Sequence, residues 1–403
     1  MIIEDQTHLT YCTNIHSGET WEEIFDNLKN YTVKVKERLN SDKPFGIGLR
    51  LSQKSASVLL QGNNLTNFKT WLDTNNLYVF TMNGFPYGEF HNTTIKDQVH
   101  TPDWTTENRV SYTQNLMNIL AYLLPKGMEG SVSTSPLSYK HWFNNQTDLD
   151  KTTKKSCQSL IQIVLQLIDI RKATGKLLHL DLEPEPDGFL ENTQEVIDFY
   201  KDHLFKEGVL IIQKRLGCKS EEAKAYILEH IQVCYDICHF ALAYESPKFV
   251  ISNLQNEGIK IGKIQISAAI KCQKSDTIPI SSQQSYLRQF DEPTYLHQSV
   301  VKLDKGNLVH FSDLSEGIDF MTNAGFKEIR THFHIPIFIS NFQVLKSTQN
   351  EIIDALNLWK EIKYSNHLEI ETYTWSILPE HLQTDITSSI VREFEWVVKQ
   401  LSN

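Results

Sequence analysis

The chain is short of cysteines, of long apolar runs and of basic residues, and each shortage excludes a class of protein. Six cysteines in 403 residues are too few for a disulfide framework, so we expect a reducing compartment. No apolar stretch approaches the ~20 residues that a membrane-spanning helix needs. The first residues also lack the basic start and apolar run of a signal peptide. We therefore expect a cytoplasmic protein without a transmembrane segment.

Acidic residues outnumber basic ones. The 39 lysines and arginines face 49 aspartates and glutamates, which gives a formal net charge of −10. A protein that binds a nucleic-acid duplex needs a basic surface to displace counterions, and no segment of this chain predicts one. We expect no nucleic-acid partner.

Strand-like and helix-like segments alternate along the whole chain, which indicates a parallel sheet with crossover helices. Helical spacing is clear at Trp21, Ile24, Phe25 and Leu28, which form one apolar stripe. Eight segments are predicted to be strands, at residues 9–15, 45–51, 77–82, 130–134, 177–182, 231–235, 262–267 and 368–373. Eight such units predict one (β/α)₈ TIM barrel domain spanning residues 1–403, because this fold passes 400 residues when its loops carry insertions.

Two insertions are predicted, after the fifth and seventh strands. Residues 192–230 read as extra helices. Residues 268–367 are expected to cover one end of the barrel, and within them residues 331–338 predict an extra strand or loop laid across that end.

The alternation of side chains along the strands places polar groups inside the barrel. In residues 178–183 the leucines share one face, whereas His179, Asp181 and Glu183 share the other. The same alternation groups Cys234 with Asp236, Gln265 with Ser267, and Glu369 with Glu371. Ionisable groups inside a barrel cost several kcal/mol unless they have partners. We therefore expect a divalent metal ion or a polar substrate at the C-terminal mouth, where the fold carries its catalytic residues.

The order of these residues on successive strands resembles the xylose isomerase-like TIM barrels, which include sugar isomerases and epimerases. Glu183 comes first, Asp236 follows with His239 three residues later, and Gln265 and Glu371 complete the order. Residues 9–16, 81–88, 183–186, 332–336 and 371–375 are similar, more narrowly, to the EboE family of metabolite traffic proteins. That resemblance covers essentially the whole chain. It implies the barrel fold and the delivery of a small-molecule precursor toward membrane-bound pathway partners.

Carried over by position, the resemblance implies roles for individual residues. Glu183 and Glu371 match two metal ligands that in epimerases also transfer the proton. Asp236 matches a further carboxylate ligand, and His239 matches a histidine that contacts substrate. Gln265 stands where many relatives have a ligating histidine. Because an amide oxygen is a weaker ligand than imidazole for transition metals, this difference favours Mn²⁺ or Mg²⁺ over Zn²⁺ and leaves a degraded site as an alternative.

Other polar residues at or beyond strand ends are candidate substrate contacts. They are Asn14, His16, Arg50, Asn83, Tyr87, Glu185, His332 and His334.

Each candidate has a structural alternative. Glu183 and Glu371 could form ion pairs with Arg50 or a lysine, and Asp236 could cap a helix. Asn83 and Tyr87 could shape a turn. His332 and His334, which alternate with apolar residues, could face solvent.

Two functional hypotheses follow from this pattern. The first is a metal-dependent isomerase or epimerase that acts on a polyol, a sugar or a sugar phosphate, with the two glutamates as acid and base. The second is a non-catalytic carrier that holds a metabolite in the barrel mouth, which the glutamine at position 265 and the large second insertion favour. A nuclease is disfavoured by the acidic charge and the shortage of histidine ligands.

Overall fold

The computed structural model describes residues 1–4, 6–39, 42–88, 96–375, 378 and 385–402. Its main sheet has the strand order β1-β2-β15-β8-β7-β6-β5-β4-β3, and a parallel bridge between Cys12 and Gly48 brings its ends together as a barrel. The barrel strands are β2 (Thr7–Tyr11), β3 (Phe45–Arg50), β4 (Leu77–Asn83), β5 (Gly130–Thr134), β6 (Leu178–Leu182), β7 (Ile231–Asp236), β8 (Ile261–Ile266) and β15 (His367–Ile370). All eight predicted strands are present, and β1 (Ile2–Glu4) adds an antiparallel partner to β2.

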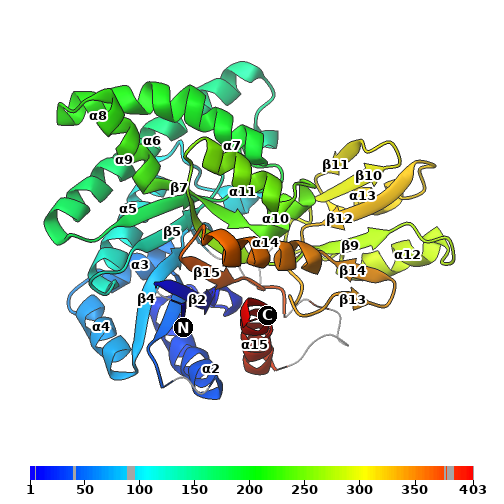
Figure 1. Ribbon diagram of the computed structural model, residues 1–403, viewed down its shortest axis with the longest axis horizontal. Helices are drawn as coiled ribbons and strands as arrows, with labels where there is room; N and C mark the ends of the chain where they lie inside the picture. Colours follow the sequence, from blue (N-terminus) through cyan, green and yellow to red (C-terminus); the bar gives the residue numbers. More distant parts are fainter. Residues whose placement is uncertain (5, 40–41, 89–95, 376–377, 379–384, 403) are drawn as a thin grey trace.

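Helices surround the barrel, as the apolar stripes of the sequence predict (Figure 1). Those outside the second insertion are α1 (Trp21–Asn27), α2 (Val33–Arg38), α3 (Gln53–Leu59), α4 (Asn64–Thr74), α5 (Glu107–Leu123), α6 (Gln146–Thr174), α7 (Thr193–Phe199), α8 (Val209–Leu216), α9 (Ser220–His230), α10 (Ile237–Leu242), α11 (Pro247–Asn256) and α15 (Ile386–Ser402). Short 3₁₀ or π-helical segments lie at Thr13–Ile15, Leu28–Thr32, Lys96–His100, Lys140–Trp142, Tyr200–Gly208 and Arg288–Phe290. Gly175 ends α6 in the left-handed conformation that glycine adopts without strain.

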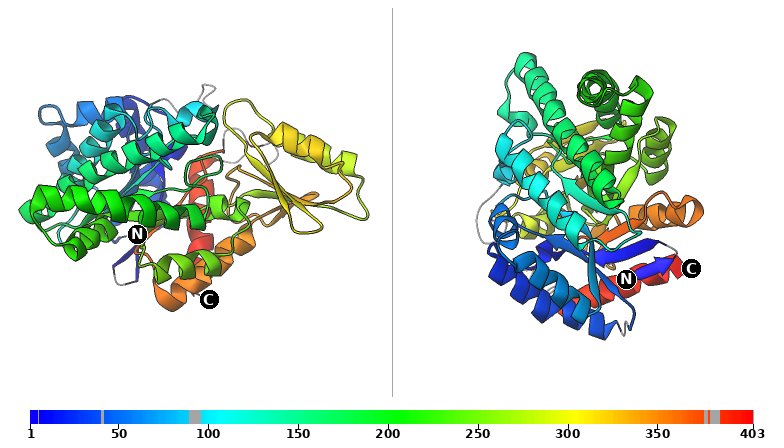
Figure 2. Two further views of the ribbon diagram at one scale, coloured as in Figure 1. Left: turned by 90° about the horizontal axis from the view of Figure 1, so that it is seen from above. Right: turned by 90° about the vertical axis from the view of Figure 1, so that its left-hand side faces the viewer.

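The first predicted insertion is helical, because α7, α8 and α9 fill it. The second, at residues 268–367, forms a separate antiparallel sheet with the strand order β11-β10-β12-β9-β14-β13. Its elements are β9 (Ile270–Gln273), α12 (Ile280–Leu287), β10 (Ser299–Leu303), β11 (Leu308–Phe311), α13 (Leu314–Phe320), β12 (Phe326–Thr331), β13 (Asn341–Phe342) and β14 (Leu345–Ser347). This second sheet extends to one side of the barrel (Figure 2). The last part of the insertion is instead α14 (Gln349–Ile362), which packs beside α11 as an ordinary barrel helix.

The segment at residues 331–338 is a loop rather than a strand. β12 ends at Thr331, and residues 332–336 have no regular secondary structure. The loop returns to the barrel, where Ile335 donates its backbone N–H to the carbonyl oxygen of Ala268, directly after β8. The insertion thereby delivers a chain segment to the carboxyl ends of the barrel strands.

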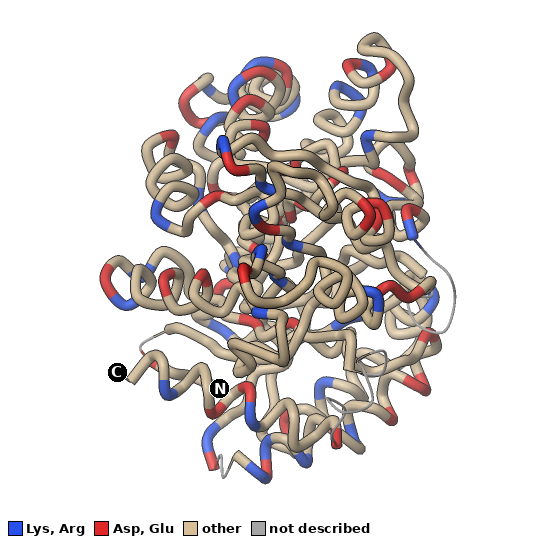
Figure 3. The backbone as a smooth tube through the Cα atoms, turned by 90° about the vertical axis from the view of Figure 1, so that its right-hand side faces the viewer, with Lys and Arg blue, Asp and Glu red and all other residues tan. Residues whose placement is uncertain are grey.

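Charges are distributed differently outside and inside the barrel. Acidic and basic residues are interspersed along the helices and the second sheet (Figure 3). Inside the barrel, Lys263 of β8 and Glu369 of β15 form a fully buried ion pair at 2.8 Å. Burial alone would lower the pKa of Lys263, but the Glu369 carboxylate outweighs burial and raises that pKa above its ordinary value. Gly48 provides the room, since a Cβ atom there would collide with the Glu369 carboxylate.

None of the helices among the described residues is long and apolar enough to span a bilayer.

The buried ion pair leads to a stability prediction. Lys263→Met leaves the Glu369 carboxylate buried without its partner, so we expect the free energy of unfolding to fall by about 3–5 kcal/mol. Urea denaturation followed by circular dichroism measures this change. The control is Lys206→Met, because Lys206 and its partner Asp202 are both exposed and should contribute little. A Lys263→Met protein as stable as the wild type would contradict the assignment.

Candidate functional site

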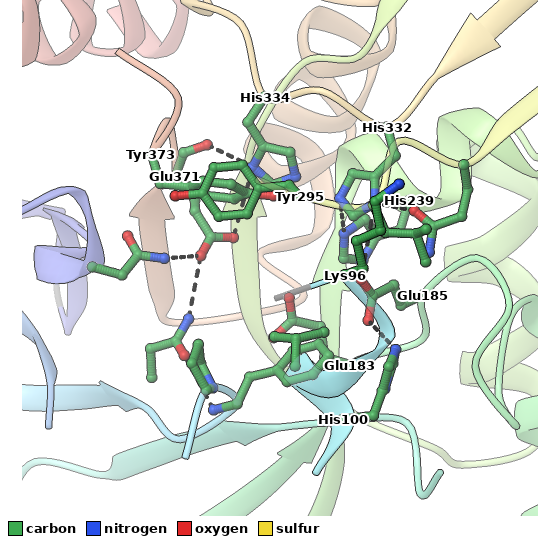
Figure 4. A pocket seen from close by; sticks show the side chains of 17 residues that line it. Lys96, His100, Glu183, Glu185, His239, Tyr295, His332, His334, Glu371 and Tyr373 are labelled. Atoms are coloured by element: carbon green, nitrogen blue, oxygen red, sulfur yellow. Dashed lines mark hydrogen bonds and ion pairs between the residues drawn. The ribbon is translucent and has the colours of Figure 1, made fainter. Parts of the chain in front are cut away.

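A cavity of about 600 Å³, including its open mouth, lies at the carboxyl ends of the barrel strands. Eight predicted site residues line it, namely Asn14, Asn83, Glu183, Glu185, His239, His332, His334 and Glu371 (Figure 4). Strand ends supply most of these side chains, and the loop after β12 supplies His332 and His334.

Three carboxylates meet at this end of the barrel, and we call Glu183, Asp236 and Glu371 the carboxylate triad. Glu183 directly follows β6, Asp236 ends β7 and Glu371 directly follows β15. One oxygen from each lies within 4.8 Å of the other two, and all three side chains are buried. Within the described part of the chain, no lysine or arginine forms an ion pair with any of them. The alternative of an ion pair with Arg50 or a lysine is therefore not what the structure shows for Glu183 and Glu371.

The protonation of the carboxylate triad reflects this crowding. Burial and the neighbouring Asp236 carboxylate raise the pKa of Glu183 to about 8. Burial and the charge of Glu183 raise the pKa of Glu371 well above its usual range. Burial also acts to raise the pKa of Asp236, but the imidazoles of His239 and His334 and its hydrogen bonds reverse the effect and lower it. Three carboxylates so close together cannot all ionise at neutral pH without added positive charge.

Asp236 caps a helix and also faces the site. Its Oδ1 accepts hydrogen bonds from the backbone N–H of His239 at 3.2 Å and from the Ser267 hydroxyl at 2.6 Å. This capping of α10 is the structural alternative that the sequence allowed. The other oxygen, Oδ2, lies 3.9 Å from Nε2 of His334 and has no hydrogen-bond partner in the described residues. One carboxyl group thus anchors the helix and directs its second oxygen toward the site.

Two asparagines fix the orientation of Glu371. The amide groups of Asn14 and Asn83 donate to Glu371 Oε1, at 2.7 and 3.2 Å. Asn83 Oδ1 also accepts a hydrogen bond from the backbone N–H of Phe85 at 3.2 Å. Asn83 therefore shapes the turn after β4 and also contacts Glu371. Both bonds point Glu371 into the cavity (Figure 4).

His334 presents a nitrogen lone pair to the carboxylate triad. Its Nδ1 donates to the backbone carbonyl oxygen of Glu371 at 3.0 Å, which leaves Nε2 unprotonated. Burial lowers the pKa of His334 to about 4, so the ring is neutral at pH 7. Such a bond to one ring nitrogen is how proteins orient metal-ligating histidines. The sequence predicted that His334 contacts substrate, whereas this geometry suits a residue that ligates a metal ion.

Gln265 occupies the strand position where an imidazole was expected. It pairs in register with Asp236 on one side and with Glu369 on the other, and it is fully buried. Neither atom of its amide has a hydrogen-bond partner in the described residues. Buried amides are nearly always hydrogen-bonded, so this one is available to a ligand. Gln265 and Asp236 do not themselves line the cavity.

Three predicted substrate contacts, Arg50, His16 and Tyr87, are not among the cavity-lining residues. The guanidinium of Arg50 donates to the backbone oxygens of Gly18 and Gly88, and it pairs with Glu19 at 2.9 Å. Through these contacts, the guanidinium of Arg50 holds neighbouring loops together outside the cavity.

His16 and Tyr87 are involved in packing. His16 Nε2 lies 3.1 Å from the hydroxyl of Tyr11, and its ring stacks on Tyr31 at 4.5 Å between centroids. Tyr87 packs edge-on against Tyr112 at 5.1 Å. A position just past a strand end does not determine whether a side chain turns inward, because the loop path decides it.

Sequence analysis missed several residues that line the cavity, notably His100, Lys96, Tyr295 and Tyr373. His100 is fully buried, and its Nε2 lies 3.6 Å from Glu185 Oε2. Lys96 lies in the same short helix and pairs with Asp313 at 2.6 Å. Both belong to a short helix and not to a strand, so no strand alternation could have predicted them. Only their chemical type, a histidine and a lysine, was visible in the sequence.

Comparison with solved structures supports the barrel topology. No protein-family model and no curated protein matches the sequence. The chain is similar to a xylose isomerase-like TIM barrel protein from Mycobacterium smegmatis in complex with magnesium, with a TM-score of 0.50 and 9% identity over 98% of this chain and 97% of that one. It is also similar to the IolI protein with a binding zinc atom, with a TM-score of 0.48 and 10% identity over 98% of both chains. A D-tagatose 3-epimerase-like protein gives a TM-score of 0.47 and 12% identity over 98% of this chain and 97% of that one.

The fold is therefore that of a xylose isomerase-like TIM barrel, as the sequence predicted. At identities this low, the similarity establishes the fold alone. The narrower resemblance to the EboE family stays a prediction.

Glu393 of α15 bonds to residues next to the site, and its burial predicts how the stability of the protein depends on pH. Its Oε1 accepts from the Thr372 hydroxyl at 2.8 Å and from the backbone N–H of Ile337 at 3.2 Å, next to Glu371 and the His334 loop. Burial raises the pKa of Glu393 to about 8. The folded protein thus keeps a proton that the unfolded chain releases above about pH 4.5, so stability falls as the pH rises from about 4.5 to about 8.

Glu393→Gln removes this titration and should flatten the decline, with the largest gain over wild type near pH 8. Urea unfolding at pH 5 and pH 8, with chelator present throughout, measures the difference. Glu395→Gln, an exposed position on the same helix, is the matched control. An equal pH dependence in Glu393→Gln and wild type would show that Glu393 is ionised in the fold.

Proposed function

We propose that this protein is a metal-dependent isomerase or epimerase that acts on a small polyol, a keto sugar or a sugar phosphate. The observation that carries the proposal is the carboxylate triad, buried at the carboxyl ends of three strands beside the cavity. The magnesium complex of the M. smegmatis protein, which shares the fold, is consistent with such a centre.

The residues present fit a divalent cation. Glu183, Asp236 and Glu371 would hold it through oxygen, with His334 Nε2 and the Gln265 amide oxygen as further ligands. A mostly oxygen donor set suits Mn²⁺ or Mg²⁺, and the imidazole keeps Zn²⁺ as an alternative. His334, which the inserted loop supplies, would replace the imidazole that Gln265 lacks. When bound, the cation polarises substrate oxygens and makes the adjacent C–H more acidic.

The protein's own groups supply proton transfer and orientation. Glu183 and Glu371 come from different strands and both line the cavity (Figure 4), so one could accept a proton from a substrate carbon and the other could return it. Asn14 and Asn83 hold Glu371 in position for that step. Phe85, Tyr295 and Tyr373 form apolar walls that keep water from the reacting carbon.

A non-catalytic carrier with the same cavity is the second candidate, and the Gln265 amide is the observation that favours it. A role in metabolite traffic with membrane-bound partners, as in the EboE family, would belong to this function or accompany catalysis in the cytoplasm. Binding without chemistry would distinguish the two candidates.

Metal binding tests the ligand assignment. Glu183→Ala and Glu371→Ala each remove a proposed ligand, and we expect the dissociation constant for Mn²⁺ to rise at least ~100-fold, because even outer-shell changes cost 10–100-fold. Electron paramagnetic resonance of free Mn²⁺ measures it on chelator-treated protein. Glu19→Ala, which alters the Arg50 pair outside the cavity, serves as the control. Unchanged Mn²⁺ binding in Glu183→Ala would show that the triad is not the site.

Proton exchange tests the reaction. In D₂O with Mn²⁺, we expect wild-type protein to exchange the C–H next to the carbonyl of a ketose or keto-polyol, observed as loss of its proton NMR signal. Glu183→Gln and Glu371→Gln should slow exchange by about 10²–10⁴-fold, the usual contribution of a general acid or base. Glu222→Gln on the exposed face of α9 should exchange like wild type. A ketose or keto-polyol that raises the melting temperature of the protein, and whose C–H never exchanges, would instead indicate the carrier.

A further inference from the structure

Two histidines and a glutamate form a second cluster in the cavity, on the side away from Glu371 (Figure 4). His239 lies in α10, His332 lies in the loop after β12 and Glu185 lies in the loop after β6. One ligand-type atom of each lies within 4.8 Å of the other two, and all three side chains are buried. The proposed reaction uses Glu183, Glu371 and their neighbours and leaves this cluster without a role.

The hydrogen bonds determine which nitrogen of each ring carries the proton. His239 Nδ1 lies 2.8 Å from the carbonyl oxygen of Pro184, which can only accept, so Nδ1 is protonated. Gln298 donates its amide N–H to the carbonyl oxygen of Pro186 at 3.0 Å, and its Oε1 therefore faces His332 Nδ1 at 2.9 Å. His332 Nδ1 must be protonated as well. When each ring carries only this one proton, its Nε2 keeps a bare lone pair.

These two lone pairs face each other. Nε2 of His239 and Nε2 of His332 are 3.1 Å apart, and without a positive charge between them they repel. The Glu185 carboxylate lies beside them, with its Oε1 3.9 Å from His332 Nδ1. Within the described part of the chain, no lysine or arginine pairs with it.

We propose that His239 Nε2, His332 Nε2 and the Glu185 carboxylate form a second cation site, of zinc type, beside the carboxylate triad. Two imidazoles and one carboxylate are a common zinc ligand set. The 3.1 Å between the nitrogens is close to the roughly 3.3 Å that separates two ligands at about 2.0 Å from a tetrahedral zinc. Bonds from each Nδ1 to Pro184 and Gln298 orient the rings as outer-shell partners do in metal sites.

Asp236 connects the second site with the carboxylate triad. Its Oδ2 lies 3.7 Å from His239 Nε2 and 3.9 Å from His334 Nε2. The cavity therefore offers an oxygen-rich site and a nitrogen-rich site on either side of one shared carboxylate. Such a pair would hold two neighbouring oxygens of one substrate, which favours a polyoxygenated ligand. The second site needs neither the isomerase activity nor occupancy of the first.

Zinc stoichiometry tests the proposal. Chelator-treated protein is titrated with Zn²⁺ against a chromophoric competitor, and zinc is then counted by mass spectrometry after gel filtration. We expect two equivalents for wild type and one for His332→Gln and Glu185→Gln, both of which preserve side-chain volume. Glu371→Gln should also hold one, but at the other site. His310→Gln, a half-exposed histidine outside the cavity, should keep two.

The absorption spectrum of bound Co²⁺ identifies which of the two sites a variant has lost. It also tests the second site in the wild-type protein if one variant fails to fold. Co²⁺ bound by His239 and His332 should give visible absorption bands that disappear in His332→Gln and persist in Glu371→Gln. If His332→Gln binds as many equivalents as wild type with the same bands, the second site does not exist. One equivalent that only Glu371→Gln removes would overturn the second site and leave the proposed function standing. One equivalent that only His332→Gln removes would support the second site and overturn metal binding at the carboxylate triad.

Discussion

Three buried carboxylates that meet with no lysine or arginine beside them, in the part of the chain that the structure describes, are the constraint on which the rest of the site depends. Glu183, Asp236 and Glu371 come from three strands, and each is costly to ionise in the barrel interior. Groups around them are arranged to hold negative charge: amides point at Glu371, and Asp236 accepts bonds from Ser267 and the start of α10. The proposed cation would balance the charge of these carboxylates.

Charge inside the barrel is separated into layers. Below the carboxylate triad, Lys263 and Glu369 neutralise each other, and Gly48 leaves them the space. Lys263, whose charge acts to lower the pKa of Glu183 and of Glu371, is thus paired with another carboxylate. This separation leaves the carboxylates of the upper layer without a paired lysine or arginine in the described part of the chain, which suits the proposed metal centre.

The inserted second sheet contributes to the site through its return loop. His332 and His334 enter the cavity from this loop and face the carboxylates that the barrel supplies. Their Nδ1 atoms are held by Gln298 and by the backbone of Glu371, so the rings are oriented before any ligand arrives. In the proposed metal centre, this loop would supply the imidazole that the strand lacks because position 265 is a glutamine.

The sequence by itself determined the barrel and the carboxylate triad. The alternation of side chains along a strand is a local property of the pleated backbone, so Glu183, Asp236, Gln265 and Glu371 could be placed on the inner face of successive strands without any tertiary information. Loop residues obey no such rule. Only the tertiary structure decided that Arg50 turns to Glu19, that His100 reaches Glu185, and that Nε2 of His239 lies 3.1 Å from Nε2 of His332. Those outcomes depend on long-range packing between segments far apart in the chain, which no local pattern encodes.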